Sequence, residues 1–192
     1  DHALQDIVRG LNKSLQSNST SADATVTNGV TAFTSDGFNL GAGGGTPAEQ
    51  TAAIMIGYEK LLLADKSDLC LVVGDVTSTM ACAITAQKLG IPVAHVEAGI
   101  RSGDWSMPEE INRILTDRVT TLYCCPTDSA VKCLKNEGVV VGIINSGDVM
   151  YDVALFYKNK FDSLGVLNKY NLSVHEYVLC TFHRAENTDD FN

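Results

Sequence analysis

The sequence predicts an α/β protein built on a doubly wound parallel sheet. From residue 46 onward, short apolar runs alternate with helical segments. The runs are apolar at nearly every position, as expected for strands that helices cover on both faces. Alternation of strands and helices in this order is typical of parallel strands joined by crossover helices.

The first well-defined element is a helix predicted at residues 46–64. Thr46 can cap it, Pro47 suits its first turn, and Glu49 completes a capping box. Before it, residues 1–20 give a short helical pattern followed by a loop, residues 25–27 and 30–33 could be extended, and residues 41–45 form a glycine-rich loop. After it, we expect strands at residues 69–73, 92–96, 121–125, 139–144 and 177–182, and helices at residues 78–89, 109–116, 128–137 and 149–164.

The pattern divides the chain into two parts. Residues 1–165 are expected to form a Rossmann-like lobe, and residues 166–192 a connecting segment followed by the first strand of a second lobe. The chain has 192 residues, begins with Asp1 rather than Met, and stops soon after the last expected strand. We therefore expect a fragment at both ends.

Composition and charge exclude several classes of partner. The net charge is −9 and no Lys/Arg-rich run exists, so neither nucleic acid nor an anionic membrane is an expected partner. No apolar run approaches the roughly 18 residues of a membrane helix, and no signal peptide is visible. A small anionic substrate stays compatible, because local donors rather than net charge would hold it.

The six cysteines predict a reducing, cytoplasmic environment. None lies in a Cys-x-x-Cys motif, and no histidine pair has metal-ligand spacing, so we expect no disulfide and no metal. Four are expected to be reduced core residues inside apolar strands: Cys70, Cys124, Cys125 and Cys180.

Polar residues follow three of the predicted strands. Asp75, Glu97 and His183 each come just after a strand. Ligands of open parallel sheets bind outside the carboxyl ends of the strands, so these residues are candidates for a site. Structural alternatives stay open: Asp75 could be a capping or turn residue, Thr77 or Ser78 could cap the helix, and Glu97 could pair with His95 or Arg101.

A third acidic cluster begins the helix expected at residues 109–116. Ser106 and Glu109 fit a capping box, and Glu109 and Arg113 fit an ion pair one turn apart. Alternatively, Glu109 and Glu110 could be aimed into a crevice from the positive end of the helix.

The segment after the last expected strand also carries polar groups, His183, Arg184, Glu186 and Asn187. Arginine and histidine donors suit a phosphate or a sugar. The chain contains neither G-x-x-x-x-G-K-[ST] nor G-x-G-x-x-G, and we expect no cofactor. The glycines of residues 41–45 are read as a flexible loop.

Four of these stretches together resemble the non-hydrolysing UDP-N-acetylglucosamine 2-epimerases. They are GDVTST, HVEAGIRSGDWSMPEEINR, SGDVMYD and TFHRAEN, and the resemblance covers roughly residues 38–192. It implies a two-lobed fold like that of glycosyltransferase-B enzymes, with the active site between the lobes. It also implies interconversion of UDP-N-acetylglucosamine (UDP-GlcNAc) and UDP-N-acetylmannosamine (UDP-ManNAc), by elimination and re-addition of UDP with inversion at C2.

The resemblance also implies roles for individual residues. Asp75, Glu97 and Glu109 match the family's catalytic carboxylates, and His183 its active-site histidine. Which carboxylate acts as acid and which as base stays open. The residues expected to contact substrate are Arg113, Arg184, Glu186 and Asn187. A homodimer is implied by analogy with the family.

Some family features are absent from the sequence. The opening strand, its GTRPE-type loop and most of the second lobe are missing, so we expect this piece alone to be inactive. Three alternatives stay open. The chain could belong to a related UDP-diacetamido-uronate 2-epimerase, to a nucleotide-sugar glycosyltransferase, or to a non-catalytic module that binds nucleotide sugars.

Overall fold

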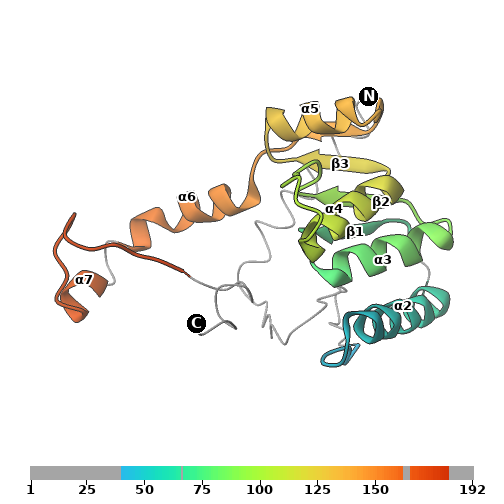
Figure 1. Ribbon diagram of the computed structural model, residues 1–192, viewed down its shortest axis with the longest axis horizontal. Helices are drawn as coiled ribbons and strands as arrows, with labels where there is room; N and C mark the ends of the chain where they lie inside the picture. The colour runs from blue at the N-terminus through green and yellow to red at the C-terminus, as the bar shows by residue number, and fades with distance from the viewer. Residues whose placement is uncertain (1–39, 66, 162–164, 182–192) are drawn as a thin grey trace. The chain divides into compact units, whose positions relative to one another are not determined.

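The computed structural model describes residues 40–65, 67–161 and 165–181 (Figure 1). The chain divides into two compact units, Asp1–Asp148 and Val149–Asn192, and each is described by itself. The lobe boundary expected at residue 165 stays a prediction. None of the helices in the described ranges is long and apolar enough to cross a membrane.

The first unit contains a four-stranded parallel sheet. Its strands are β1 (Cys70–Val73), β2 (Val93–Val96), β3 (Leu122–Cys125) and β4 (Ile143–Asn145), in the spatial order β1-β2-β3-β4. All three strand pairs are parallel, which confirms the predicted parallel α/β sheet. The order of these strands runs in one direction, so the reversal of a doubly wound sheet requires a further strand beside β1 or β4.

Helices alternate with these strands along the chain. They are α2 (Pro47–Ala64), α3 (Thr77–Lys88), α4 (Pro108–Val119) and α5 (Asp128–Asn136). The helix α3 packs on β1 and β2, α4 on β2, and α5 on β3 and β4, while α2 packs against α3 (Figure 1). The parallel connections therefore place the carboxyl ends of the four strands along one edge of the sheet.

Two apolar clusters hold these layers together. The larger joins α2 and α3 to the first two strands, with Ile54, Leu62, Cys70, Val72, Ala81, Cys82, Ala83, Ala86, Ile91 and Val93. The smaller lies between β3 and α5, with Ala98, Tyr123, Cys125, Ala130 and Leu134. The predicted burial of Cys70, Cys124 and Cys125 is confirmed, and all three are free thiols.

The helix α2 begins at the predicted capping box. The backbone N–H of Glu49 donates to Thr46 Oγ1 at 3.3 Å, and the N–H of Thr46 donates to Glu49 Oε2 at 2.7 Å. These bonds satisfy two backbone donors that a helix start otherwise leaves unpaired.

Replacing Thr46 with alanine is expected to cost about 1 kcal/mol of stability, because the cap for the Glu49 N–H is lost. Thr51→Ala is the matched control, since Thr51 lies inside the same helix and bonds only the carbonyl of Pro47. Alanine favours a helix interior, so the control should not lose stability. Urea unfolding of both variants measures the difference, and equal effects would show that the cap contributes nothing.

The strand β4 begins later than predicted. We expected it to start at residue 139, but it starts at Ile143, and Val140 and Val141 are 86% and 75% exposed. Gly142 explains the delay, because its φ is +79° and a side chain there would lie 2.2 Å from the Thr121 carbonyl oxygen. The chain therefore turns at Gly142 before it enters the sheet.

The second unit contains α6 (Val149–Phe161) and the short α7 (Val166–Lys169). The strand predicted at residues 177–182 is wrong for its described part, because residues 177–181 form no strand. Val178 is 87% exposed and Cys180 is exposed, so Cys180 is not the core residue we expected. A strand needs a neighbour to pair with, and the described residues of this unit supply none.

Candidate active site

Gly74 and Asp75 form the turn that follows the first strand, β1, and α4 holds this turn. Arg113 donates from Nε to Asp75 Oδ2 at 2.8 Å, and its Nη2 contacts the same oxygen. Asn112 donates from Nδ2 to the Asp75 carbonyl at 2.8 Å. The carboxylate of Asp75 thus points at a cation on a neighbouring helix and does not cap α3.

The expected side-chain caps of α3 are wrong. The helix is preceded by Val76, and no side chain caps its first turn. The hydroxyl of Thr79 donates back to the carbonyl of Val73 at 2.8 Å instead. The capping alternatives for residues 75, 77 and 78 are therefore wrong, whereas Asp75 does lie in the bend between β1 and α3.

Glu97 directly follows the second strand, β2, and has an unusual backbone. Its φ is +73°, in the left-handed region that residues other than glycine seldom adopt. Such a conformation costs on the order of 1–3 kcal/mol and is concentrated at functional sites. The carboxyl group lies beside Gly74, because a side chain added at Gly74 would lie 3.5 Å from Glu97 Oε2. Asp75 and Glu97 are therefore neighbours at one edge of the sheet.

The surroundings of Glu97 raise the pKa of its carboxyl group. Burial is the largest cause, followed by the negative charges of Asp75 and Asp148. Electrostatic interactions with His95 and Arg113 act in the opposite direction without cancelling these effects. A carboxyl group whose pKa is raised by burial and by neighbouring negative charges is a better proton acceptor than an ordinary carboxylate, which suits a general base.

At the start of α4, the buried acid is Glu110. Its side chain is 1% exposed and accepts the backbone N–H groups of Ser102 and Gly103, both at 2.9 Å. Arg113 Nη1 adds a third donor at 3.0 Å. Burial alone would raise the pKa of Glu110, but these donors outweigh it and lower the pKa to about 2. Glu110 is therefore ionised at neutral pH and holds Arg113 toward Asp75.

Glu109, in contrast, is exposed. The predicted capping box is wrong, because Met107 precedes the helix without a side-chain cap and Ser106 Oγ donates to Asp104 Oδ1 at 2.6 Å. The predicted pair of Glu109 with Arg113 is also wrong, since Arg113 bonds Asp75 and Glu110. Among the described residues, the side chain of Glu109 has no hydrogen-bond partner that would give it a structural role.

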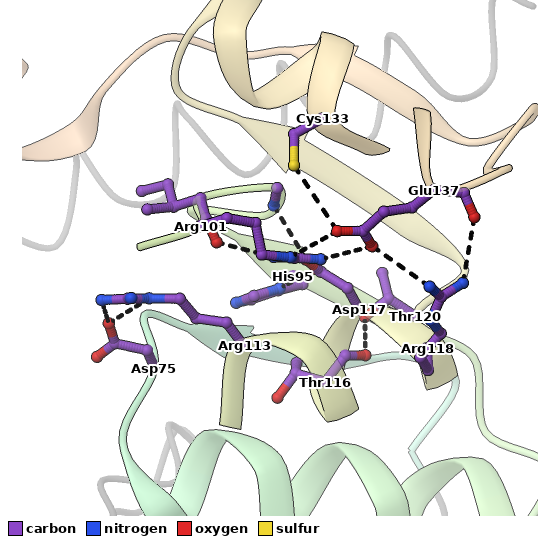
Figure 2. A network of polar contacts seen from close by, with 12 residues as sticks. Asp75, His95, Arg101, Arg113, Thr116, Asp117, Arg118, Thr120, Cys133 and Glu137 are labelled. Carbon is purple, nitrogen blue, oxygen red and sulfur yellow. Dashed lines mark hydrogen bonds and ion pairs between the residues drawn. The ribbon is translucent and has the colours of Figure 1, made fainter. Parts of the chain in front are cut away.

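A buried network of polar contacts is centred on Asp117, with His95 and Arg101 close to its carboxylate (Figure 2). Asp117 is 2% exposed, and its Oδ1 lies 2.7 Å from His95 Nδ1. Its Oδ2 accepts the Gly99 N–H at 3.1 Å and pairs with Arg101 Nη1 at 2.7 Å. Arg101 also pairs with Glu137 at 2.8 Å. The expected alternatives in which Glu97 pairs with His95 or Arg101 are therefore wrong, because both partners bind Asp117.

Sequence reasoning missed Asp117, and it named Glu110 only as one of two glutamates that could be aimed into a crevice. Together with Arg113 they are spaced by three and four residues, which places all three on one face of a helix. Such a charged stripe is usually read as solvent-exposed. The nearby strand-end carboxylates were the signal that it could face inward instead.

The hydroxyl of Thr116 is an exception to the paired polar groups of α4. Thr116 is fully buried, and the structure describes no hydrogen-bond partner for its Oγ1. A buried hydroxyl without a partner is destabilising, so Thr116→Val should leave stability unchanged or raise it by up to about 1 kcal/mol. Urea unfolding measures this, and a loss of more than about 1 kcal/mol would mean that the hydroxyl is bonded.

The structure thus brings together part of the predicted site. Asp75, Glu97 and Arg113 lie at one edge of the sheet, and Glu109 is exposed at the start of α4. Four expected site residues lie outside the described residues: His183, Arg184, Glu186 and Asn187. Within the described ranges, no group of three His, Cys, Asp or Glu side chains could hold a metal ion.

Comparison with known proteins identifies the family. Residues 15–192 match the family model described as UDP-N-acetylglucosamine 2-epimerase. The chain belongs to the UDP-N-acetylglucosamine 2-epimerase family. The resemblance carried by the four sequence stretches is therefore confirmed.

Individual members of the UDP-N-acetylglucosamine 2-epimerase family are closely similar. A UDP-N-acetylglucosamine 2-epimerase homolog of Methanococcus maripaludis is 48% identical over 157 residues, covering 79% of this chain and 43% of the relative. The UDP-2,3-diacetamido-2,3-dideoxy-D-glucuronate 2-epimerase of Pseudomonas aeruginosa is 45% identical over 157 residues, covering 80% and 43%. The chain thus spans less than half the length of these relatives.

A solved structure of the same family supports the fold. The crystal structure of Methanocaldococcus jannaschii UDP-GlcNAc 2-epimerase in complex with UDP-GlcNAc and UDP matches with a TM-score of 0.72 and 42% identity. The match covers 80% of this chain and 43% of that one. The parallel α/β architecture is therefore shared with a family member that binds a nucleotide sugar.

Proposed function

We propose that the whole protein carrying this chain interconverts UDP-GlcNAc and UDP-ManNAc. The observation that carries the proposal is the Glu97 carboxyl group, which is partly buried and has a raised pKa at the carboxyl edge of the sheet. Removal of a weakly acidic proton from a sugar carbon needs such a base. Membership of the epimerase family supports this assignment.

The proposed reaction proceeds by elimination and re-addition. A carboxylate removes the proton from C2, the electrons of that bond form the C1–C2 double bond, and the C1–O bond breaks with its electrons leaving on UDP. This gives UDP and 2-acetamidoglucal. UDP then adds back to C1 while a second group returns a proton to the opposite face of C2. Two proton-transfer groups on opposite faces are therefore required.

We assign the proton transfers to carboxylates of this chain. Glu97 exchanges a proton with C2, and Glu109, whose side chain the described structure leaves exposed, is the proposed group for the other face, with His183. Asp75 keeps Arg113 beside Glu97, so the charge balance of the site is fixed before substrate binds. The proposed contacts to UDP are Arg113, Arg184, Glu186 and Asn187.

A second substrate deserves equal testing, because a relative that is 45% identical is named a UDP-2,3-diacetamido-2,3-dideoxy-D-glucuronate 2-epimerase. That sugar has the same acetamido group at C2, so the same carboxylates would serve. Incubation of the whole protein with each UDP-sugar, followed by proton NMR, tests both. The proposal expects a mixture of C2 epimers from UDP-GlcNAc. Epimers from the uronate alone would make that sugar the substrate. If neither sugar gives an epimer, the proposed function is overturned.

We also propose that the whole protein is a cytoplasmic homodimer. The support is family membership and six cysteines that are all free, which suits a reducing compartment. Light scattering of the purified whole protein measures the oligomeric state, and a monomer at micromolar concentration would contradict the proposal.

A further inference from the structure

The contacts of Asp117 converge on the turn that presents Glu97. His95 lies two residues before Glu97 and Gly99 two residues after it, and one carboxylate on α4 binds both. The third contact, with Arg101, continues along the same segment. All three partners thus flank the single residue of this turn that has a left-handed backbone without being glycine.

We propose that Asp117 is a positioning residue for Glu97. It holds the turn of residues 95–101 in the one conformation that directs the Glu97 carboxyl group toward Gly74 and Asp75. The proposal rests on the function proposed above for this site. Asp117 itself is buried behind the turn and has no role in touching substrate.

His95 connects Asp117 to the turn that carries Asp75 as well. Its Nδ1 faces Asp117 at 2.7 Å, and its Nε2 faces the Gly74 carbonyl oxygen at 2.8 Å. Both oxygens are acceptors only, so a ring that carries a proton on each nitrogen donates to both at once. Through His95, Asp117 therefore ties the Glu97 turn to Gly74, the residue that precedes Asp75.

Arg101 fixes the outer end of the turn. Its guanidinium lies between Asp117 and Glu137, with Nε 2.8 Å from Glu137 Oε1 and Nη2 3.0 Å from Oε2 (Figure 2). Glu137 ends α5, so the turn is clamped between α4 and α5. Gly99 fits the same closely packed space, because a side chain there would lie 2.5 Å from the Ala130 carbonyl oxygen.

The test is Asp117→Asn in the whole protein. The amide keeps the shape of the side chain but offers a donor where His95, Gly99 and Arg101 also donate. Displacing a catalytic group by about 1 Å can cost about 100-fold in rate. We therefore expect kcat to fall by about that factor, while KM and the Kd for UDP change less than about twofold. A purely structural role would lower the melting temperature. It would leave kcat unchanged when kcat is measured well below that temperature.

A double-mutant cycle with Glu97→Gln separates positioning from an independent effect. If Asp117 acts through Glu97, adding Asp117→Asn to Glu97→Gln lowers kcat little further. If the two losses multiply, Asp117 acts elsewhere and the proposal fails. Should Asp117→Asn not fold, His95→Gln enters the same cycle, because glutamine can donate to only one of the two acceptors.

Two control variants each remove a polar group that does not bond Asp117. Asp128→Asn removes an exposed carboxylate that bonds Asn145, and Thr116→Val alters the buried neighbour of Asp117. Both should keep wild-type kcat. A crystal structure of Asp117→Asn gives a readout that needs no activity, since the φ of Glu97 should leave the left-handed region.

These outcomes distinguish the two proposals. An active wild type with unchanged kcat in Asp117→Asn would overturn the positioning role and leave the proposed function standing. An inactive wild type would overturn the function, and the crystal structure would then decide the positioning role alone. An unchanged turn in that structure would contradict it.

Discussion

Glu97→Gln in the whole protein is expected to lower kcat by about 10²- to 10⁴-fold, the range that general acid–base groups contribute. Glutamine cannot accept the C2 proton, but its size preserves contacts with Gly74. Binding of UDP-GlcNAc should change little, because the contacts proposed above hold the substrate through its UDP. Steady-state kinetics measures the first effect, and isothermal calorimetry the second.

The same variant should not lose stability. The folded protein raises the pKa of Glu97, so its ionised form is disfavoured there relative to the unfolded chain. Removing that charge leaves the free energy of unfolding equal or higher at neutral pH. A variant with little activity and an unchanged melting temperature therefore supports proton transfer. Near-normal turnover would reduce Glu97 to a structural residue.

Glu110→Gln is expected to destabilise the protein by on the order of 3 kcal/mol at pH 7. The pKa of Glu110 falls from an ordinary 4.5 to about 2, and this difference corresponds to that free energy. Because the folded-state pKa is lowered, the stabilisation is present above about pH 5. It is lost as the pH falls toward about 2, where Glu110 becomes protonated even when folded.

The sign of this effect gives a specific experiment. Urea unfolding of wild type and Glu110→Gln at pH 7 and pH 3 should show a difference that shrinks at the lower pH. Asp128→Asn is again the control, because its carboxylate is exposed. A Glu110→Gln cost below about 1 kcal/mol at pH 7, or one that does not shrink on acidification, would contradict this account.

Much of the sheet could be predicted because its strands are short apolar runs between clear helix signals. The strand ends followed from the same pattern, so Asp75 and Glu97 were found without contacts. The start of β4 was misplaced because Val140 and Val141 look like strand residues, and only the close approach of Gly142 to Thr121 excludes them.

The polar interior of α4 could not be predicted in the same way. Ser106 and Glu109 matched a capping box, but the hydroxyl of Ser106 is used by Asp104. Glu110 and Asp117 look like surface charges in sequence, and become buried only because backbone N–H groups, His95 and arginines converge on them. Such convergence depends on residues far apart in the chain.

The segment at residues 177–181 illustrates a further limit. Its apolar run has the composition of a strand, but strand formation depends on hydrogen bonds to a neighbouring strand. A local pattern contains no information about that neighbour.

The most direct test of the central claim follows hydrogen at C2. The whole protein is incubated with UDP-GlcNAc in deuterium oxide, and the UDP-ManNAc formed is analysed by NMR. Proton removal by one side chain and return by another predicts one deuterium at C2 in each molecule of UDP-ManNAc. UDP-ManNAc that retains its original hydrogen at C2 would contradict the account.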